Sequence, residues 1–308
     1  MNSDFKLPKV SILIPVYNNL QYAIEAIDSA LSQTYPNKEI VISDDSVQGI
    51  LYAELEQLYL DRPEIRLYRN KHNIGRVKNY NKLLYKLSTG EYILCLDGDD
   101  IILDNNLVSK SIDLIRQYPE VVFVQSRLFR GKEKPQFESF EDNSYKIFSP
   151  VDYIYKVLGT NRFNHQTTVY NADRAKEINF YIEDILSSDA ESLVRLGMTG
   201  SVILRNEKAV FWRNHGDNAS ETVNIPELIK NAKVLTNNLY DAVTEINPRN
   251  KLENKRFKNK LMIQLLSPIF FKSIQSRQWS GLMKLIRYLP CYFNSSTIHY
   301  LSNKLINR

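Results

Sequence analysis

The sequence predicts an α/β protein built around a largely parallel sheet. Two observations predict it: apolar strand-like runs alternate with helical patterns in the first third of the chain, and acidic or turn-forming residues follow three of those runs. A wholly helical pattern begins after Pro226. With 308 residues, 43% hydrophobic and 24% charged, the chain can bury one large core and carry an appendage.

The elements of the first half follow from apolar periodicity. Residues 10–16 (VSILIPV) form a buried strand by their β-branched content, and Ile24, Ile27 and Leu31 then mark one face of a helix ending near Gln33. The same reading predicts strands over 38–43, 65–69, 92–96 and 121–125, and helices over 76–87 and 105–118, the last ending before Pro119.

The second half is less regular. A charged, loop-like stretch is expected over 127–149, followed by a helix over 151–158, a strand over 166–170, a helix over 189–196 and a strand over 209–214. Helices are predicted over 228–246, 257–274 and 279–289. We therefore place a boundary near residue 222, between a catalytic domain (1–222) and a basic helical region (223–308).

Charge divides the chain in the same way. Residues 249–308 carry twelve Lys or Arg against the single acid Glu253, a net charge of +11, which leaves −6 for residues 1–248 out of a total of +5. An acidic body needs a metal or cationic side chains to hold a phosphorylated ligand. The basic helices would suit an anionic membrane surface, or else form a solvated face.

Location is predicted from absences in the sequence. Met1 to Lys9 lack a signal-peptide core, and no apolar stretch reaches the roughly 18 residues of a membrane span. Cys95 and Cys291 give no disulfide framework, which suits a reducing compartment. We expect a cytoplasmic protein, with peripheral contact to the inner face of the membrane through its basic helices.

The stretch Asp97-Gly98-Asp99-Asp100 directly follows a predicted buried strand. Carboxylates one residue apart at a strand end can share a hard cation that bridges two phosphate oxygens, and Gly98 would leave room for that ligand. Alone, an acid-x-acid pattern is often a turn. Three acids behind a buried strand repel one another unless an ion compensates them, so a metal site is favoured here.

Two other segments end at the same predicted edge of the sheet. Asp44 and Asp45 can accept hydrogen bonds from a base or a ribose, or else serve as loop or capping acids. After the first strand, a base can lie against the aromatic ring and exposed backbone of Pro15, Tyr17 and Asn18, unless these residues form a simple turn.

The sequence lacks the usual glycine-rich phosphate-binding motifs. The chain contains neither GxGxxG nor GxxxxGK[ST], which favours a metal-held diphosphate over a dehydrogenase or P-loop enzyme. Asn73, Gly75 and Arg76 precede a helix and can present backbone N–H groups or a guanidinium to anionic oxygens, or form an ordinary capping turn.

Two residues of the second half carry possible chemistry. Asp189 opens an amphipathic helix, where a carboxylate can take the proton of an acceptor hydroxyl or simply balance the helix dipole. His215, beside Gly216, can ligate a metal, contact phosphate or be an ordinary surface histidine.

Taken in order, these segments resemble the inverting glycosyltransferases of family 2, which have the GT-A fold. The matching strings are VSILIPVYNN (10–19), EIVISDDS (39–46), NIGRVKNYN (73–81), GEYILCLDGDD (90–100), SSDAESLVRLG (187–197) and RNHGDNAS (213–220). The resemblance covers residues 9 to about 221 and does not specify the sugar. It implies a Rossmann-like mixed sheet flanked by helices, with a helical C-terminal region.

The resemblance also implies roles for residues. Asp97 would touch the ribose and lie with Asp99 and His215 at a divalent metal, Mn or Mg, while Asp189 would be the general base. The nucleotide-sugar site would comprise Pro15, Tyr17, Asn18, Asp44, Asp45, Asn73, Gly75, Arg76, Asp97 and Gly98. The chain departs from the family in having Ser188 before Asp189, where Glu is common, and no Gly between Asp45 and Ser46.

The predicted activity is metal-dependent, inverting transfer of a sugar from a nucleoside-diphosphate sugar, a UDP-sugar by preference, to a hydroxyl of a glycan or lipid-linked glycan. By analogy the pathway is bacterial surface polysaccharide synthesis, such as O-antigen or capsule. A sugar-phosphate nucleotidyltransferase and a degenerate glycan- or partner-binding protein are the alternatives. The basic residues show no nucleic-acid recognition motif, so no nucleic-acid partner is expected.

Overall fold

The structure, a computed structural model, describes residues 7–132, 144–157, 163–216, 218 and 224–275, without the side chains of 264 and 267–275. The described part holds a nine-stranded sheet in the order β3-β2-β1-β4-β8-β6-β9-β5, with β7 paired to β9 off that path. The strands are β1 (Val10–Val16), β2 (Lys38–Asp44), β3 (Ile65–Arg69), β4 (Tyr92–Cys95), β5 (Ile101–Ile102), β6 (Val121–Gly131), β7 (Tyr145–Phe148), β8 (Thr168–Asn171) and β9 (Ser201–Arg213).

Helices alternate with the strands. They are α1 (Leu20–Leu31), α2 (Ile50–Leu58), α3 (Arg76–Lys82) with the π-helical turn η1 (Leu83–Leu87), α4 (Leu107–Gln117), α5 (Pro150–Asp152) with the π-helical turn η2 (Tyr153–Val157), α6 (Ala172–Glu177), α7 (Ser188–Gly197), α9 (Ile225–Ile246) and α10 (Lys251–Gln275). Side-chain caps fix several starts: Asn19 accepts the Tyr22 N–H at 3.0 Å at α1, and Asn224 accepts the Glu227 N–H at 3.0 Å at α9.

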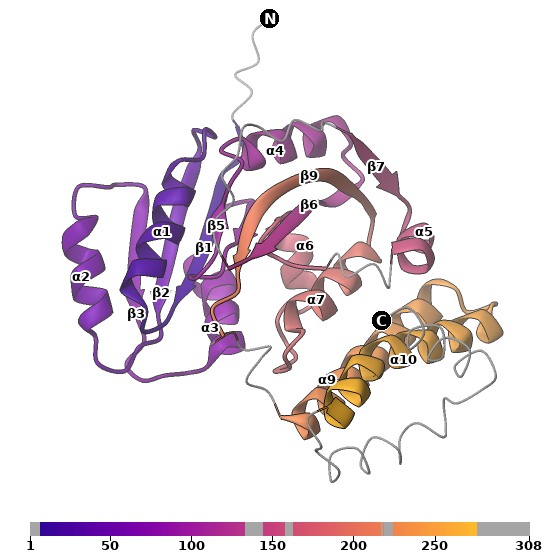
Figure 1. Cartoon of the computed structure of the whole chain (residues 1–308). Helices are drawn as coiled ribbons and strands as arrows, with labels where there is room; N and C mark the ends of the chain where they lie inside the picture. Colours follow the sequence, from indigo (N-terminus) through magenta and orange to yellow (C-terminus); the bar gives the residue numbers. More distant parts are fainter. Residues whose placement is uncertain (1–6, 133–143, 158–162, 217, 219–223, 276–308) are drawn as a thin grey trace, which may run out of the picture. The chain divides into compact units, whose positions relative to one another are not determined.

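The sheet is parallel on one side and mixed on the other. Strands β3, β2, β1 and β4 are parallel neighbours, whereas β8 lies antiparallel between β4 and β6. Strand β9 runs parallel to β6 along its length, as Figure 1 shows, and pairs on its other edge with β7 and then with β5. The α/β class and the mixed sheet expected from the family resemblance are confirmed.

The loop predicted over 127–149 is wrong in its described parts. Strand β6 continues to Gly131, and β7 occupies Tyr145–Phe148, while 133–143 lie outside the described residues. The strand predicted from Ala209 already begins at Ser201. Charge misled both predictions: Arg205 and Glu207 of β9 are buried because they pair with each other, and Glu207 also accepts a hydrogen bond from Lys110 at 2.7 Å.

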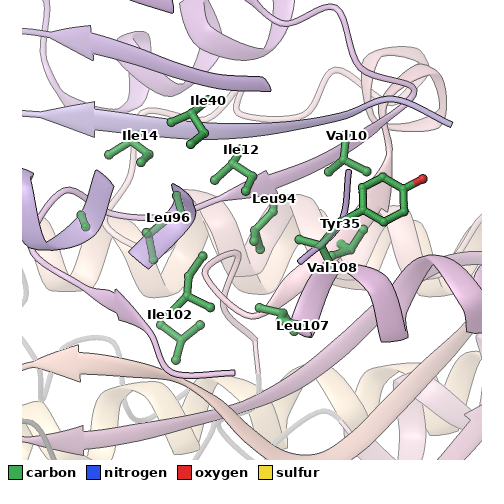
Figure 2. Close-up of a cluster of buried hydrophobic side chains, with 14 of the residues drawn as sticks. Val10, Ile12, Ile14, Tyr35, Ile40, Leu94, Leu96, Ile102, Leu107 and Val108 are labelled. Carbon is green, nitrogen blue, oxygen red and sulfur yellow. The ribbon is translucent and has the colours of Figure 1, made fainter. Parts of the chain in front are cut away.

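The main core lies between one face of the sheet and helices α1, α2 and α4. Alternate residues of β1 point into it, since successive side chains of a strand face opposite ways. Figure 2 shows Val10, Ile12 and Ile14 of β1 beside Ile40 and Leu94 of the neighbouring strands, all fully buried. Leu107 and Val108 of α4 close the same cluster. This packing holds the strands whose carboxyl ends carry the acids.

A buried carboxylate joins the strands at their opposite, amino-terminal end. Glu39 accepts hydrogen bonds from Ser11 Oγ at 2.5 Å, Thr89 N at 2.8 Å and Lys9 Nζ at 2.8 Å, and Arg66 lies at 3.1 Å. Burial raises the pKa of Glu39, but these donors outweigh it and lower the pKa to about 2. Glu39 therefore stays ionised and ties β1, β2 and β3 together.

The described residues divide into two compact units. The first comprises those up to Pro150 with Phe163–Asp184 and Ser188–Gly216, and the second comprises the described parts of Val151–Arg162, Ile185–Ser187 and Asp217–Arg308. The boundary predicted near residue 222, the helix predicted over 279–289 and Cys291 lie outside the described residues.

In the second unit, α9 and α10 pack through an apolar cluster formed by Ile229, Ala232, Met262 and Leu266. A buried polar contact accompanies it: Tyr155 Oη donates to Asn254 Oδ1 at 2.6 Å, and Asn254 Nδ2 donates to the Asn247 carbonyl at 2.9 Å. Helix α10 begins at Lys251, six residues before its predicted start. Among the described helices, none has the length and apolarity needed to cross a bilayer.

Candidate active site

The acids predicted to form the site meet at the carboxyl ends of the parallel strands. Strands β1, β2 and β4 run parallel and in register, so the segments that follow them leave the sheet at one edge. Carboxylate oxygens of Asp97, Asp99 and Asp100, directly after β4, all lie within 4.8 Å of one another. Each of these acids has a different environment.

Asp97 is held by three side chains from other segments. Its Oδ1 accepts a hydrogen bond from Tyr80 Oη at 2.6 Å and lies 3.3 Å from His165 Nε2, and its Oδ2 accepts one from Gln166 Nε2 at 2.7 Å. Burial raises the pKa of Asp97, but His165, Tyr80 and the nearby Arg76 together lower it to about 2. This carboxylate is therefore ionised at neutral pH.

Asp99 and Asp100 have fewer partners. Asp99 Oδ2 lies 2.9 Å from His215 Nε2, and Asp100 Oδ1 accepts the Arg213 N–H at 3.0 Å. The other oxygen of Asp100 is buried and has no hydrogen-bond partner among the described residues. Burial and the neighbouring acids raise the pKa of Asp99, and they raise that of Asp100 well above its ordinary value.

This donor set fits a divalent cation. Carboxylate oxygens are the ligands that Mg²⁺ and Mn²⁺ prefer, and a cation among these acids would satisfy the orphaned Asp100 oxygen and remove their repulsion. The three residues predicted at the metal, Asp97, Asp99 and His215, do lie together. Asp100 joins them.

The end of β9 is fastened to the acidic loop by Arg213. Its Nε donates to the Asp99 carbonyl at 3.0 Å, while its guanidinium pairs with Glu25 and stacks 4.3 Å from the centre of the Tyr22 ring on α1. The His215 ring also packs on Tyr22, 5.3 Å away. Helix α1 thus holds the segment that carries His215.

Gly98 serves the backbone of the acidic loop. A Cβ added there would lie 2.5 Å from the Pro15 carbonyl oxygen and 3.0 Å from Val16 Cγ1. The missing side chain therefore lets the acidic loop approach the end of β1, a role that the sequence did not predict.

Asp44 and Asp45 have different hydrogen-bond partners. Both oxygens of Asp45 accept hydrogen bonds from the segment before α3, with Ile74 N and Gly75 N at 2.9 Å, and Asn73 Nδ2 donates to the Asp45 carbonyl at 3.2 Å. Asp44 accepts the Ser46 N–H at 2.8 Å through Oδ1, while its Oδ2 is buried without a partner among the described residues. Asp45 therefore positions residues 73–75.

Pro15, Tyr17 and Asn18 lie at the end of β1, as predicted. The Tyr17 side chain is 56% exposed, which leaves its ring available for stacking. Asn18 adopts a left-handed conformation (φ 56°), and its N–H donates to Ser46 Oγ at 2.8 Å, so the segment after β1 is tied to the one after β2. These residues border the acids on one sheet edge.

Asp189 lies in the first turn of α7, and Arg76 connects it electrostatically to the acidic loop. Burial lowers the pKa of the Arg76 guanidinium, but the Tyr80 hydroxyl and the carboxylates of Asp97 and Asp189 outweigh it and raise that pKa. The guanidinium also stacks on the Tyr80 ring, 5.4 Å from its centre. The predicted base and the predicted metal site therefore share one cationic neighbour.

Comparison with known proteins identifies this arrangement. A family model described as "Glycosyl transferase family 2" matches residues 11–178, more than half of the chain. The chain belongs to glycosyl transferase family 2. It is by family a glycosyltransferase, and the resemblance drawn from the sequence motifs is confirmed.

Relatives of this family 2 transferase are distant. The chain is 24% identical over 235 residues to an uncharacterized glycosyltransferase of Haemophilus influenzae, covering 70% of this chain and 69% of that one. It is 21% identical over 227 residues to the poly(ribitol-phosphate) beta-N-acetylglucosaminyltransferase TarS of Staphylococcus aureus, covering 71% of this chain and 38% of TarS. It spans only 14% of a Rickettsia bellii glycosyltransferase, at 42% identity over 100 residues.

Solved structures agree on the fold. The S. aureus TarS complex with UDP superposes with a TM-score of 0.66 at 16% identity, covering 97% of this chain and 88% of that one. Mannosyltransferase PcManGT of Pyrobaculum calidifontis, in complex with GDP-Man and Mn²⁺, gives 0.60 at 14% identity, covering 98% and 81%. The GT-A fold of the family 2 transferase is thereby confirmed.

Several residues of the site escaped the sequence reasoning. His165, Gln166 and Tyr80 hold Asp97, and Arg213 holds the Asp99-Asp100 turn. None of them stands in a spacing that distinguishes it from ordinary core or surface residues. Tyr80 and Arg213 do fall inside quoted family strings, which was the available signal.

Proposed function

We propose that this family 2 transferase moves a sugar from a nucleoside-diphosphate sugar to a hydroxyl of a glycan or lipid-linked glycan, with inversion and with a divalent metal. The observation that carries the proposal is the acidic cluster, in which a buried Asp100 oxygen lacks a partner among the described residues and Asp99 faces His215. A UDP-sugar is the first donor to test, since TarS structures contain UDP and UDP-GlcNAc, and a GDP-sugar is the second, after PcManGT.

Asp97, Asp99, Asp100 and His215 would hold the cation. Bound there, Mn²⁺ or Mg²⁺ neutralises charge on the diphosphate as it leaves. Arg76, with its raised pKa, is a permanent cation between Asp97 and Asp189 and would bind the same anionic oxygens from the protein side.

The nucleoside would lie at the ends of β1 and β2. Tyr17 offers an exposed ring for the base, and Pro15, Asn18 and Gly98 border it with backbone groups. Asp45 would act by ordering Asn73 and Gly75, whereas Asp44 keeps an acceptor oxygen that has no hydrogen-bond partner among the described residues.

Asp189 would be the general base. Its carboxylate takes the proton of the acceptor hydroxyl, whose oxygen forms a bond to the anomeric carbon as the bond from that carbon to the diphosphate oxygen breaks. The electron pair of the broken bond leaves with the nucleoside diphosphate. A single displacement of this kind inverts the anomeric configuration.

Helix α10 would bring the enzyme to an anionic membrane surface, where a lipid-linked acceptor resides. Its first turns expose Lys251, Lys255, Arg256 and Lys260, together with Leu252 at 64% exposure. Flotation with vesicles of neutral lipid alone and with vesicles that contain anionic lipid separates charge-dependent binding from none. A Lys255→Glu/Arg256→Glu variant should lose the binding if α10 carries it.

The decisive experiment is a donor screen with Mn²⁺ or Mg²⁺, comparing the unmodified chain with Asp99→Asn and Asp189→Asn. Asp173→Asn is the control, because Asp173 is an acid in the first turn of α6 as Asp189 is in the first turn of α7, although Asp173 is exposed and Asp189 is half-buried. Both site variants should lose most of the metal-dependent release of nucleoside diphosphate, and the control should keep it.

Other products decide between the alternatives. Release of pyrophosphate would indicate a nucleotidyltransferase. Binding of a nucleotide sugar without turnover under any acceptor would indicate a binding protein. Loss of activity in Asp173→Asn to the same degree as in Asp189→Asn would remove the argument for Asp189 as base.

A further inference from the structure

We propose that Tyr80, His165 and Gln166 are positioning residues that hold Asp97 in its working orientation before metal and donor bind. The inference rests on the proposed function of the acidic site and assigns a role to three residues that do not themselves touch the reacting groups. The evidence is that three donors from two distant segments converge on one carboxylate: Tyr80 comes from α3, and His165 and Gln166 precede β8.

All three groups are suited to donate and not to accept. The Tyr80 hydroxyl lies 2.6 Å from Asp97 Oδ1 and must donate to it, because an ionised carboxylate has no proton to give. Gln166 must turn its NH₂ group toward Asp97, because an amide oxygen would repel an ionised carboxylate. His165 can donate from Nε2 in its neutral or charged form.

The donors themselves cannot move far. Tyr80, His165 and Gln166 are 1%, 1% and 5% exposed. The Tyr80 ring meets the His165 ring edge-on, 4.9 Å between centres, and lies 5.1 Å from the ring of Tyr181, whose hydroxyl is 2.8 Å from His165 Nδ1. Asp97 is thus fixed by packed side chains on the side facing the protein.

The other two acids contrast with this. Asp99 and Asp100 rely on His215 and a backbone N–H, and the buried Oδ2 of Asp100 has no hydrogen-bond partner among the described residues. We therefore infer a division within the cluster: Asp97 is pre-positioned by the protein, and its neighbours are completed by the cation. Removing a donor from Asp97 should weaken cation affinity without removing a ligand.

The test uses Tyr80→Phe and Gln166→Met, which keep ring or side-chain length and remove one donor each. Tyr35→Phe is the matched control: Tyr35 is also buried, and its hydroxyl donates to the Pro8 carbonyl at 2.7 Å near the start of β1, away from the acids. Mn²⁺ affinity is measured by calorimetry with and without UDP, beside thermal unfolding and the dependence of turnover on Mn²⁺.

Each site variant should bind Mn²⁺ roughly tenfold more weakly, as expected for one lost hydrogen bond to a charged group. Turnover should recover when Mn²⁺ is raised to saturation, while Tyr35→Phe loses stability alone. A purely structural role would give all three variants the same loss of stability and unchanged Mn²⁺ affinity, which would overturn the inference. If the unmodified chain binds neither Mn²⁺ nor UDP, the proposed function itself fails, and the positioning role fails with it.

Discussion

Replacing Glu39 by Gln should expose how strongly one buried carboxylate stabilises the sheet without touching the site. Glu39 sits in β2 opposite Ser11 of β1 and receives donors from Lys9, Ser11 and Thr89. Five residue steps of extended strand, about 17 Å, separate it from Asp44 at the other end of β2. Stability and activity can therefore be perturbed separately.

The magnitude follows from the pKa. Holding the pKa of Glu39 at about 2, instead of the usual 4.5, makes its ionised form contribute on the order of 3 kcal/mol to folding. Lys9 and Arg66 are 38% and 36% exposed, so solvent screening reduces the expected value to about 2 kcal/mol.

The lowered pKa of Glu39 determines how stability depends on pH. The folded protein releases the Glu39 proton more readily than the unfolded chain, so this stabilisation is present above pH of about 4.5 and is lost as the pH falls toward 2. Urea unfolding between pH 7 and pH 2.5 should show Glu39→Gln less stable at pH 7 by about 2 kcal/mol, with the two curves converging in acid. If the stability of the two proteins differed by the same amount at every pH, the role of the Glu39 charge would be refuted. If Glu39→Gln lost activity at urea concentrations too low to unfold it, Glu39 would not be independent of the site.

Three further predictions concern the site itself. Gly98→Ala places a Cβ 2.5 Å from the Pro15 oxygen and should cost roughly 1 to 3 kcal/mol in urea unfolding, with weaker Mn²⁺ binding; unchanged values for both would contradict the close approach. Because the pKa values of Asp99 and Asp100 are raised, protons compete with the cation, so calorimetry should show Mn²⁺ affinity falling and proton release growing as the pH is lowered from neutral toward the ordinary range of a carboxyl group; an affinity independent of pH would contradict this. Arg213→Met loses the pairing with Glu25 and the bond to the Asp99 carbonyl and should cost roughly 1 to 3 kcal/mol, whereas Arg213→Lys, which keeps the charge, should cost less; equal losses would mean that packing alone matters.

Much of the first half of the fold could be predicted because the local pattern of apolar residues is enough to identify its strands. Strands β1 and β3 have the predicted bounds, since each is a short apolar or alternating run. Helix α2 was missed because Leu51 and Leu55 alone are buried in it, while Ile50 and Leu58 are exposed, so no apolar face is visible. Its two buried residues, Leu51 and Leu55, pack into the main core.

The second half could not be predicted as well, because ion pairs between distant residues, and not local composition, determine which of its charged segments form strands. The first half of β9 contains Arg205 and Glu207, which are buried as a pair with Lys110 of α4, a contact across about a hundred residues that no local pattern contains. The site shows the same limit: Asp97 and Asp99 stand in a recognisable motif, whereas His165 and Gln166, which hold Asp97, do not.

The pairing of strand β9 decides where chimeras between this protein and its relatives should be cut. The region recognised as family 2 ends at residue 178, yet β6, inside that region, pairs with β9 from Val121 to Gly131. A chimera cut at 178 would pair β6 with a β9 from another protein and would take the partners of Asp99 and Asp100 from that protein as well. A segment exchanged between relatives should therefore extend to Gly216. A shorter segment would place Asp99 and Asp100 beside residues of another protein, so the donor preference measured in such a chimera would belong to neither parent.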